Sequence, residues 1–469
     1  MFIDDMIEAG MRAFKENATV LFAEHAEQPL TPESAHGVTL GIQQILAAVG
    51  RATFQAYLEA KDEKEDVITV NGETFRFKYT WDKVFQTLWG PMAVDRGIYQ
   101  NASDTKTFVP LDAAWGMKDE FMTIEVREAV AFSSAHVTPE ETHSLLKKSA
   151  LFHPHPTQIK RCLEKMGHQI TANREELDKR IRQDERIPEQ TRVLAASLDG
   201  ANVLLNEPGV KKGRPAERPT GEKDQTSKTS YHNAMVGSIT FYGEVPEGAK
   251  CPQRLAGRYT SHMPEEYAPS FKKKFEAELA AAERQLPDDV IKVLVCDGAR
   301  PIWNYIEHNR QFDDYEKIID YWHTLEHLSL AAEAIFGKGS DEANAWYHKY
   351  AKKLKQEDLG ARSVLHSMDY FEMTHRLSKS ARDALATQRT YFQRNCAKMT
   401  YADFRRRGMP IGSGPVEAAC KTLVKARLCR SGMRWSREGG QRILDLRTYV
   451  KSNRWDAFWK HYNELAVAS

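Results

Sequence analysis

The spacing of apolar residues divides the chain into helical and strand-like stretches. Apolar residues recur at helical spacing through residues 1–60, which predicts helices there. Over residues 66–80 the spacing changes to an alternation around Asn71 and Gly72, a pair typical of a β-hairpin turn. Residues 81–123 follow neither period, so we expect an irregular segment.

Two short helices with a tight connection are predicted next. Thr138, followed by Pro139 and Glu141, has the pattern of a capping box at a helix N-terminus. The second helix begins after Pro156 and is expected to end at Gly167. Such a pair resembles a DNA-binding helix-turn-helix, although plain packing of two helices gives the same pattern. In the DNA-binding interpretation the second helix presents three polar residues, Gln158, Lys160 and Arg161.

The remaining segments are mostly helical by the same criterion. Residues 171–190 are charged and helical, as expected for a connector. Residues 207–230 are rich in Gly, Pro, Lys and Thr with almost no apolar residues, which predicts an exposed loop. Residues 268–285 and 324–400 have a helical period, and the second stretch shows no strand signal.

Three short apolar runs each end in an aspartate. RVLAASL leads to Asp199, IKVLVC to Asp297 and EKII to Asp320, while MVGSITFYG (235–243) is a further strand candidate. Buried strands mixed with helices predict an α/β region. Carboxylates where strands meet loops can ligate Mg²⁺, although Asp followed by Gly is also typical of a plain turn.

The strongest local signal is a loop followed by a helix within residues 408–428. Its Gly-Ser-Gly-Pro sequence (412–415) predicts a helix entry, with Glu417 in the first turn. Glu417, Lys421 and Lys425 then share one face, and the apolar residues form the other. A carboxylate there can complement the helix dipole or pair with Lys421. A single acid leading a line of lysines instead favours a metal ligand beside a track of phosphate contacts.

The composition is that of a folded globular protein. The chain has 469 residues, of which 41% are hydrophobic and 28% charged, and this excludes a largely disordered chain. No apolar stretch is long enough to span a membrane, and the acidic N-terminus does not resemble a signal peptide. The six cysteines are dispersed without a CxxC pair, so we expect reduced thiols and a cytoplasmic protein.

The net charge of +1 hides an asymmetry along the chain. Residues 1–150 contain 14 Lys and Arg against 23 Asp and Glu, whereas residues 398–454 contain 14 against 4. A basic segment of this kind indicates an anionic partner, and Trp435 and Trp455 beside it are suited to stacking on bases. A solvated helix surface is the alternative interpretation.

In order and context, several stretches resemble DDE-type insertion-sequence transposases of the Kra-four family, which is allied to the Mutator-like group. The resemblance covers roughly residues 190–462. The matching stretches are SLDGANV (197–203), VLVCDGARPIWNYI (293–306), IIDYWHTLEHL (318–328), the segment 401–428, SGMRW (431–435) and RWDAFWKHY (454–462).

The resemblance implies an α+β multidomain protein with a ribonuclease H-like α/β core. Its catalytic triad would be Asp199, Asp297 and Glu417, and Asp320 with His323 resembles the accessory D-x-x-H signature of the Mutator-like group. The expected divisions are an N-terminal helical region with a β-hairpin (1–130), a helix-turn-helix with its connector (131–190), the first part of the core (191–323), a helical insertion domain (324–400) and the second part of the core with basic DNA-binding helices (401–469).

One departure from the family concerns zinc. Many relatives carry a cysteine-paired zinc element before the helix-turn-helix, whereas residues 96–117 of this chain contain no cysteine. We therefore expect no structural zinc there, and the role of residues 60–123 is left open.

The reaction that the resemblance implies is two-metal phosphoryl transfer. Two Mg²⁺ ions about 3.5–4 Å apart, replaceable by Mn²⁺, would activate the attacking oxygen and stabilise the leaving oxygen. Asp199 would bridge both ions, and Asp297 and Glu417 would each hold one. Water would cut the end of the element, and the freed 3′-OH would then attack target DNA.

The expected partner is double-stranded DNA, as transposon ends and as target. A dimer or larger assembly would form on the DNA, in the cytoplasm with the nucleoid and away from membranes. Trp435 would stack on a base or brace the backbone. The residues expected to contact DNA, besides the helix pair, are Lys421, Lys425, Arg427, Arg430, Arg434 and Trp435.

Three other functions fit parts of the sequence. His323, Glu326 and His327 form H-x-x-E-H, the pattern of inverted zinc peptidases, but the pattern is short and no third ligand is evident. A ribonuclease H-like endonuclease that cuts without joining would use the same acids. A DNA-binding derivative that has lost catalysis is disfavoured by the intact triad.

Overall fold

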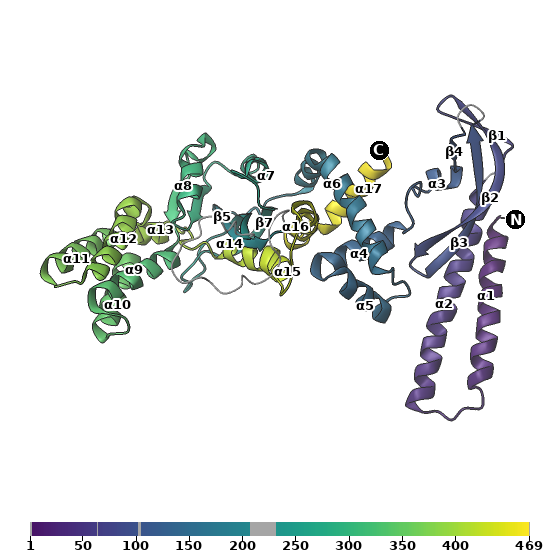
Figure 1. Ribbon diagram of the computed structural model, residues 1–469, viewed down its shortest axis with the longest axis horizontal. Coiled ribbons are helices and arrows are strands. Elements are labelled where there is room, and N and C mark those ends of the chain that lie inside the picture. The colour runs from purple at the N-terminus through teal and green to yellow at the C-terminus, as the bar shows by residue number, and fades with distance from the viewer. Residues whose placement is uncertain (1, 63, 102–104, 207–230, 469) are drawn as a thin grey trace, which may run out of the picture. The chain divides into compact units, whose positions relative to one another are not determined.

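The computed structural model describes residues 2–62, 64–101, 105–206 and 231–468, which form an α+β multidomain protein. The chain divides into two compact units, one of residues 1–173 with 462–469 and the other of residues 174–461 (Figure 1). The loop expected at 207–230 lies outside the described residues. None of the helices in the described ranges is long and apolar enough to cross a membrane.

The first unit begins with two long helices and an antiparallel sheet. Helices α1 (Phe2–His25) and α2 (Pro32–Lys61) precede strands in the order β1-β2-β3-β4. Asn71 and Gly72 both have positive φ between the first two strands, which confirms the predicted hairpin. The strand bounds are β1 (Val67–Val70), β2 (Glu73–Thr87), β3 (Gly90–Asn101) and β4 (Thr107–Phe108).

The expectation of an irregular segment at 81–123 was wrong, because β2 and β3 pair along most of their length. Phe85, Met92 and Val94 point into a small buried cluster, while the neighbouring Val84 and Ala93 are exposed. Short helices follow as α3 (Pro110–Ala114) and α4 (Ile124–His136).

The predicted helix pair is present, with one helix longer than expected. In α5 (Pro139–Ser149) the side chain of Thr138 accepts from the N–H of Glu141, and the Glu141 carboxylate accepts from the N–H of Thr138, so the capping box is confirmed. Helix α6 (Pro156–Asp184) continues through Gly167, so the predicted end there was wrong. A glycine inside a helix costs only about 1 kcal/mol, and the buried apolar face continues to Ile181.

The second unit contains a five-stranded mixed sheet in the order β7-β6-β5-β8-β9. The strands β5, β6 and β7 are antiparallel neighbours, and β5, β8 and β9 are parallel neighbours. The strand β7 was not expected from the sequence. The bounds are β5 (Val193–Leu204), β6 (Tyr231–Tyr242), β7 (Arg254–His262), β8 (Ile291–Cys296) and β9 (Glu316–Ile319).

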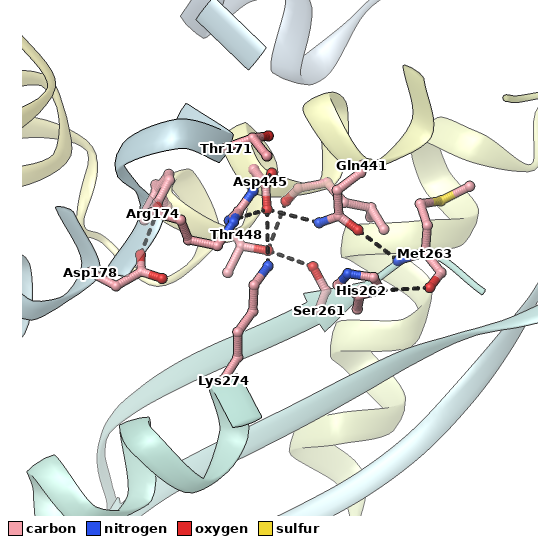
Figure 2. A network of polar contacts seen from close by, with 12 residues as sticks. Thr171, Arg174, Asp178, Ser261, His262, Met263, Lys274, Gln441, Asp445 and Thr448 are labelled. Carbon is pink, nitrogen blue, oxygen red and sulfur yellow. Dashed lines mark hydrogen bonds and ion pairs between the residues drawn. The ribbon is translucent and has the colours of Figure 1, made fainter. Parts of the chain in front are cut away.

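Helices cover both faces of this sheet. A Cβ on Gly237 would lie 2.5 Å from the Phe275 ring, so α7 (Pro269–Glu283) packs closely on one face. Ser261 points to the other face, where its hydroxyl and that of Thr448 on α16 (Arg437–Lys451) are 2.6 Å apart (Figure 2).

Residues 324–400, all of which the structure describes, are helical without a strand, as predicted. Their apolar faces join the sheet in one buried core that includes Val293, Leu328 and Phe392. The helices here and before are α8 (Arg300–Glu307), α9 (Tyr321–Phe336), α10 (Asp341–Gln356), α11 (Gly360–Thr374) and α12 (Lys379–Asn395).

The chain then returns to the sheet through a helix of mixed type. A π-helical stretch (Cys420–Lys425) interrupts the helix that contains Glu417. The elements are α13 (Tyr401–Arg406), α14 (Gly414–Ala419), the π-helix, α15 (Ala426–Leu428), α16 and α17 (Trp455–Ala468).

Candidate active site

Three aspartates lie level with one another across the parallel part of the sheet. The register of β5 against β8 pairs Ala196 with Leu294, and the same offset puts Asp199 beside Asp297. The register of β8 against β9 pairs Cys296 with Ile319, so Asp320 follows at the same level as Asp297. Acids that are far apart in the sequence therefore meet at one edge.

The first of these acids lies inside its strand. β5 continues through Asp199 and Gly200 to Leu204, so the expectation of a strand end or a turn at this position was wrong. The Asp199 carboxylate accepts a hydrogen bond of 2.7 Å from the N–H of Gly200. β5 is paired with β6 here, which leaves the half-buried carboxylate on a fixed backbone.

The second acid, Asp297, follows β8 in a half-buried position. Burial raises the pKa of Asp297 above its ordinary value, and the nearby charge of Asp199 acts in the same direction. The N–H of Ala299, 3.0 Å from the carboxylate, partly opposes this rise. The carboxylate of Asp297 thus lies in a region of concentrated negative charge.

Asp320 organises the site from a fully buried position, at 0% exposure. It caps α9, where its Oδ1 accepts from the N–H of His323 at 2.7 Å. Its Oδ2 accepts from both the backbone N–H and the hydroxyl of Ser413. Asp320 therefore ties the start of α9 to the loop that precedes Glu417.

Glu417 lies in the first turn of α14, as predicted, and its side chain is exposed. The Ser413 hydroxyl is 3.2 Å from Glu417 Oε1, so this serine stands between Asp320 and Glu417. The predicted division of the helix faces is confirmed, since Glu417, Lys421 and Lys425 are exposed. The buried side consists of Val416, Ala419, Cys420 and Leu423.

The π-helix connects Glu417 to the rest of the site. The Cys420 thiol at its start lies against Asp199, and burial together with that carboxylate raises the pKa of the thiol. Arg447 of α16 donates from Nε to the carbonyl of Leu423 at 2.7 Å and from Nη2 to that of Thr422. π-Helical turns occur often at functional sites, and this one is held by a buried arginine.

The histidines of α9 lie beside these acids. His323 is half-exposed, its Nδ1 is 3.3 Å from Glu326 Oε2, and its charge acts on Asp297. The His327 ring stacks on Tyr391 of α12, and its Nδ1 is 2.7 Å from Gln388 Oε1. Burial lowers the pKa of His327.

The acids do not form a complete metal site as they stand. Within the described ranges, no group of three His, Cys, Asp or Glu side chains is close enough to hold a metal ion. Asp199 and Asp297 are near each other. Glu417 is connected to them only indirectly, because its carboxylate is hydrogen-bonded to Ser413, and Cys420 of the same helix lies against Asp199.

The residues expected to contact DNA occupy different environments. Lys421, Lys425 and Arg430 are exposed, and Arg434 is half-buried. Arg427 is only 1% exposed, with its guanidinium 5.2 Å from the centre of the Trp435 ring, so it lies inside the protein.

Trp435 is held in place by hydrogen bonds within the protein. Its indole N–H donates to the carbonyl of Leu428 at 2.9 Å, and its backbone N–H donates to that of Leu204 at 3.0 Å.

In the first unit, the second helix of the predicted pair presents two of its three residues. Lys160 and Arg161 are exposed, and the Lys160 amine is 2.8 Å from a Glu140 oxygen. Gln158 is half-buried, and its side-chain oxygen accepts from the N–H of His155 at the helix start.

Sequence reasoning missed Ser413 and Arg447. A serine between two glycines is read as part of a loop, and an arginine in a basic segment is read as a surface residue. Only the three-dimensional contacts show that Ser413 lies between two acids and that Arg447 binds helix carbonyls.

Comparison with known proteins adds little to these observations. No protein-family model matches the chain, and no curated protein matches it. Among solved structures, a strand transfer complex of the Drosophila P element transposase is similar over 74% of this chain and 82% of its own, with 12% sequence identity and a TM-score of 0.24. At that score the likeness is weak, so the function has to be inferred from the residues of the site.

Proposed function

We propose that this protein is a DDE-type DNA transposase that cleaves the ends of an insertion sequence and joins them to target DNA. The observation that carries the proposal is the alignment of Asp199 and Asp297 on neighbouring parallel strands, with Glu417 linked to the same edge by Ser413. A five-stranded sheet with two antiparallel and two parallel pairs of neighbours, followed by a helical stretch at 324–400, is compatible with a ribonuclease H-like core and its insertion domain.

The charges at the site also support the proposal. Among the described residues, no Lys or Arg lies within ion-pair distance of Asp199, Asp297 or Glu417. Acids without cationic partners, one of them with a raised pKa, are typical of functional positions and costly for the fold. A bound cation would remove this repulsion.

The side chains fit Mg²⁺ by their chemistry, because carboxylate oxygens are its preferred protein ligands. Asp199, Asp297 and Glu417 would hold it, with Mn²⁺ as a substitute, and the exposed Glu417 side chain would have to move toward the two aspartates. When bound, the metal supplies charge stabilisation for the attacking and leaving oxygens.

The protein's own residues position these ligands. Asp320 uses both carboxylate oxygens for hydrogen bonds within the protein, so its role would be to fix the Glu417 loop. His323 is near enough to Asp297 to favour its ionised form and is placed to exchange protons at the site. Ser413 restrains Glu417.

The DNA would follow the basic residues beyond the acids. Lys421, Lys425, Arg430 and Arg434 would contact phosphates, and Lys160 and Arg161 would contribute to recognition of the element ends. Because joining two ends requires two active sites, we propose a dimer or larger assembly on DNA, acting in the cytoplasm on the nucleoid.

The test uses the full-length protein and DNA from the sequences that flank its gene. Wild type should nick this DNA in Mg²⁺ and join the 3′ end to a target plasmid. Glu417→Ala should abolish both reactions and still bind the DNA, whereas Glu438→Gln, an exposed acid on α16, should leave them unchanged. Strand cleavage by Glu417→Ala would refute the assignment of Glu417 to the catalytic triad. Cleavage without joining would indicate the endonuclease instead, and zinc-dependent peptide cleavage would indicate the H-x-x-E-H peptidase.

A further inference from the structure

An exposed tryptophan stands at the edge of the candidate active site. Trp322 directly follows the first residue of α9, between Asp320 and His323, and 61% of its surface is exposed. Its aromatic neighbour Tyr321 is buried, and the two rings meet edge to face at 5.4 Å. An indole offers a large flat face that can stack on another ring, and this one lies beside the acids.

The indole is held against the loop that leads to Glu417. A Cβ on Gly412 would lie 3.2 Å from Trp322 Cδ1, which is closer than an ordinary contact, so the indole packs directly against the backbone of Gly412. The N–H of Tyr321 donates to the carbonyl of Ile411 at 2.9 Å, which fixes the two segments together. The ring is therefore a fixed surface.

A lysine lies above the same pair of rings. The Lys355 amine is 5.5 Å from the centre of the Tyr321 ring and 5.9 Å from that of Trp322. Its backbone is anchored, because Arg405 donates to the Lys355 carbonyl at 3.3 Å. In the part of the chain that the structure describes, this amine has no carboxylate within ion-pair distance.

We infer that Trp322 and Lys355 form a nucleotide subsite that holds one unpaired DNA base next to the cleaved phosphate. The base stacks on the exposed indole, and the lysine binds a phosphate of the same nucleotide. Aromatic rings stack with any base, and a lysine near the ring supplies the backbone contact. This inference rests on the proposed function, because it assigns the position of the DNA strand at that site.

The direct test is photocrosslinking. DNA with 5-iodouracil at single positions around the cut is bound to the full-length protein in Ca²⁺, irradiated, and the attached peptide is identified by mass spectrometry. One position should crosslink to Trp322. A matched control is Trp81 on β2, which is 64% exposed and should not crosslink at that position.

The kinetic test separates stacking from simple packing. Trp322→Ala should slow cleavage of fully paired DNA by about tenfold to a hundredfold, and Trp322→Phe should retain most of the rate. A mismatch at the crosslinking position should restore the Trp322→Ala rate, because the base is then already unpaired. Lys355→Gln should weaken the binding of paired and of mismatched DNA equally.

The outcomes distinguish this subsite from the proposed function. If wild type cleaves DNA, but Trp322 does not crosslink and Trp322→Ala cuts paired DNA normally, the subsite is refuted and the transposase proposal stands. If wild type cleaves no DNA in Mg²⁺ and Trp322 still crosslinks, the transposase proposal fails and the nucleotide subsite stands.

Discussion

Two groups of acidic side chains in residues 174–461 are built in opposite ways. The paired cluster consists of Asp445 and Glu278 with the cations around them (Figure 2 shows Asp445). The open cluster consists of Asp199, Asp297, Asp320 and Glu417. Both contain buried carboxylates, yet only the paired cluster contains arginines and lysines at ion-pair distance among the described residues.

In the paired cluster each acid has matched cations. Burial alone would raise the pKa of Asp445, but Lys274 and Arg174 lower it to about 2. Glu278, on α7, bonds to Arg454 at 2.8 Å and to Arg182 at 3.0 Å, which keep its pKa low despite burial. These acids connect α6, α7 and α16, and their negative charge is neutralised by cations of the protein.

In the open cluster burial and mutual repulsion act without such compensation. Asp297 has a raised pKa, and Asp320 is satisfied by hydrogen bonds from neutral groups. The contrast shows how a structural acid differs from a functional one, since the first is matched by protein cations and the second is left for a ligand.

The largest expected effect is on the paired cluster. Asp445→Asn should lower the free energy of unfolding by about 3–5 kcal/mol, because it removes the buried charge that Arg174 and Lys274, both half-buried, are paired with. The measurement is urea unfolding at pH 7. Glu438 on the same helix pairs with Arg442, and its side chain is exposed. Glu438→Gln should therefore change the free energy of unfolding by less than about 1 kcal/mol.

The pKa of Asp445 determines how this difference in stability changes with pH. The folded pKa of Asp445 is below the unfolded value of about 3.9, so its contribution is present above pH 4 and is lost as the pH falls toward 2. Wild type and Asp445→Asn should therefore converge in stability in acid. A constant difference from pH 7 to pH 2 would show that Asp445 is not the titrating group.

The second prediction tests how α16 serves the open cluster. Arg447 binds two carbonyls of the π-helix. Burial beside Arg427 and Arg430 lowers its pKa to about 10, so a charged arginine at this position costs folding free energy. Arg447→Met should displace Glu417 and slow Mg²⁺-dependent cleavage by about 100-fold. It should also raise the Mg²⁺ concentration needed for half-maximal rate, with little change in DNA affinity.

A purely structural role would give a different pattern. Loss of thermal stability with an unchanged Mg²⁺ dependence would refute the positioning role of Arg447. Arg447→Lys, which can still donate to one carbonyl, should recover part of the Mg²⁺ response. Arg442→Met, on the same helix, serves as the control for loss of a guanidinium.

The sequence predicted the acids of the open cluster but not their arrangement. Apolar runs before Asp199, Asp297 and Asp320 are local signals, and so is the helix entry before Glu417. Their alignment depends on which strands pair in parallel, and that is a long-range property. For the same reason the burial of Arg427 was not evident, because a charge count does not show which guanidinium lies inside.

The third prediction concerns the stability cost of an open acid. The folded pKa of Asp297 is above its unfolded value, so its charge destabilises the fold at neutral pH and not in strong acid. Asp297→Asn should abolish cleavage yet raise the free energy of unfolding by up to about 1 kcal/mol, a small amount because solvent screens this part-exposed group.

That gain should shrink as the pH falls through the raised folded pKa of Asp297, and it should be gone once the pH is below the unfolded value of about 4. Mg²⁺ should stabilise wild type against heat and leave Asp297→Asn unaffected, measured as the shift in melting temperature. A variant less stable than wild type at pH 7 without Mg²⁺ would place Asp297 with the paired acids.

The smallest expected effect is on DNA affinity and concerns lysines that have no acidic partner. Lys421 and Lys425 are exposed and, within the described residues, lack a carboxylate at ion-pair distance, whereas Arg454 is matched by Glu185 and Glu278. Because a lysine that contacts a phosphate releases about one counterion, Lys421→Gln and Lys425→Gln should each reduce the slope of log affinity against log salt by about 0.9. Lys451→Gln, at the exposed end of α16, should leave the slope unchanged. Equal slopes for all three variants would mean that these lysines form a solvated surface and that the DNA follows another face.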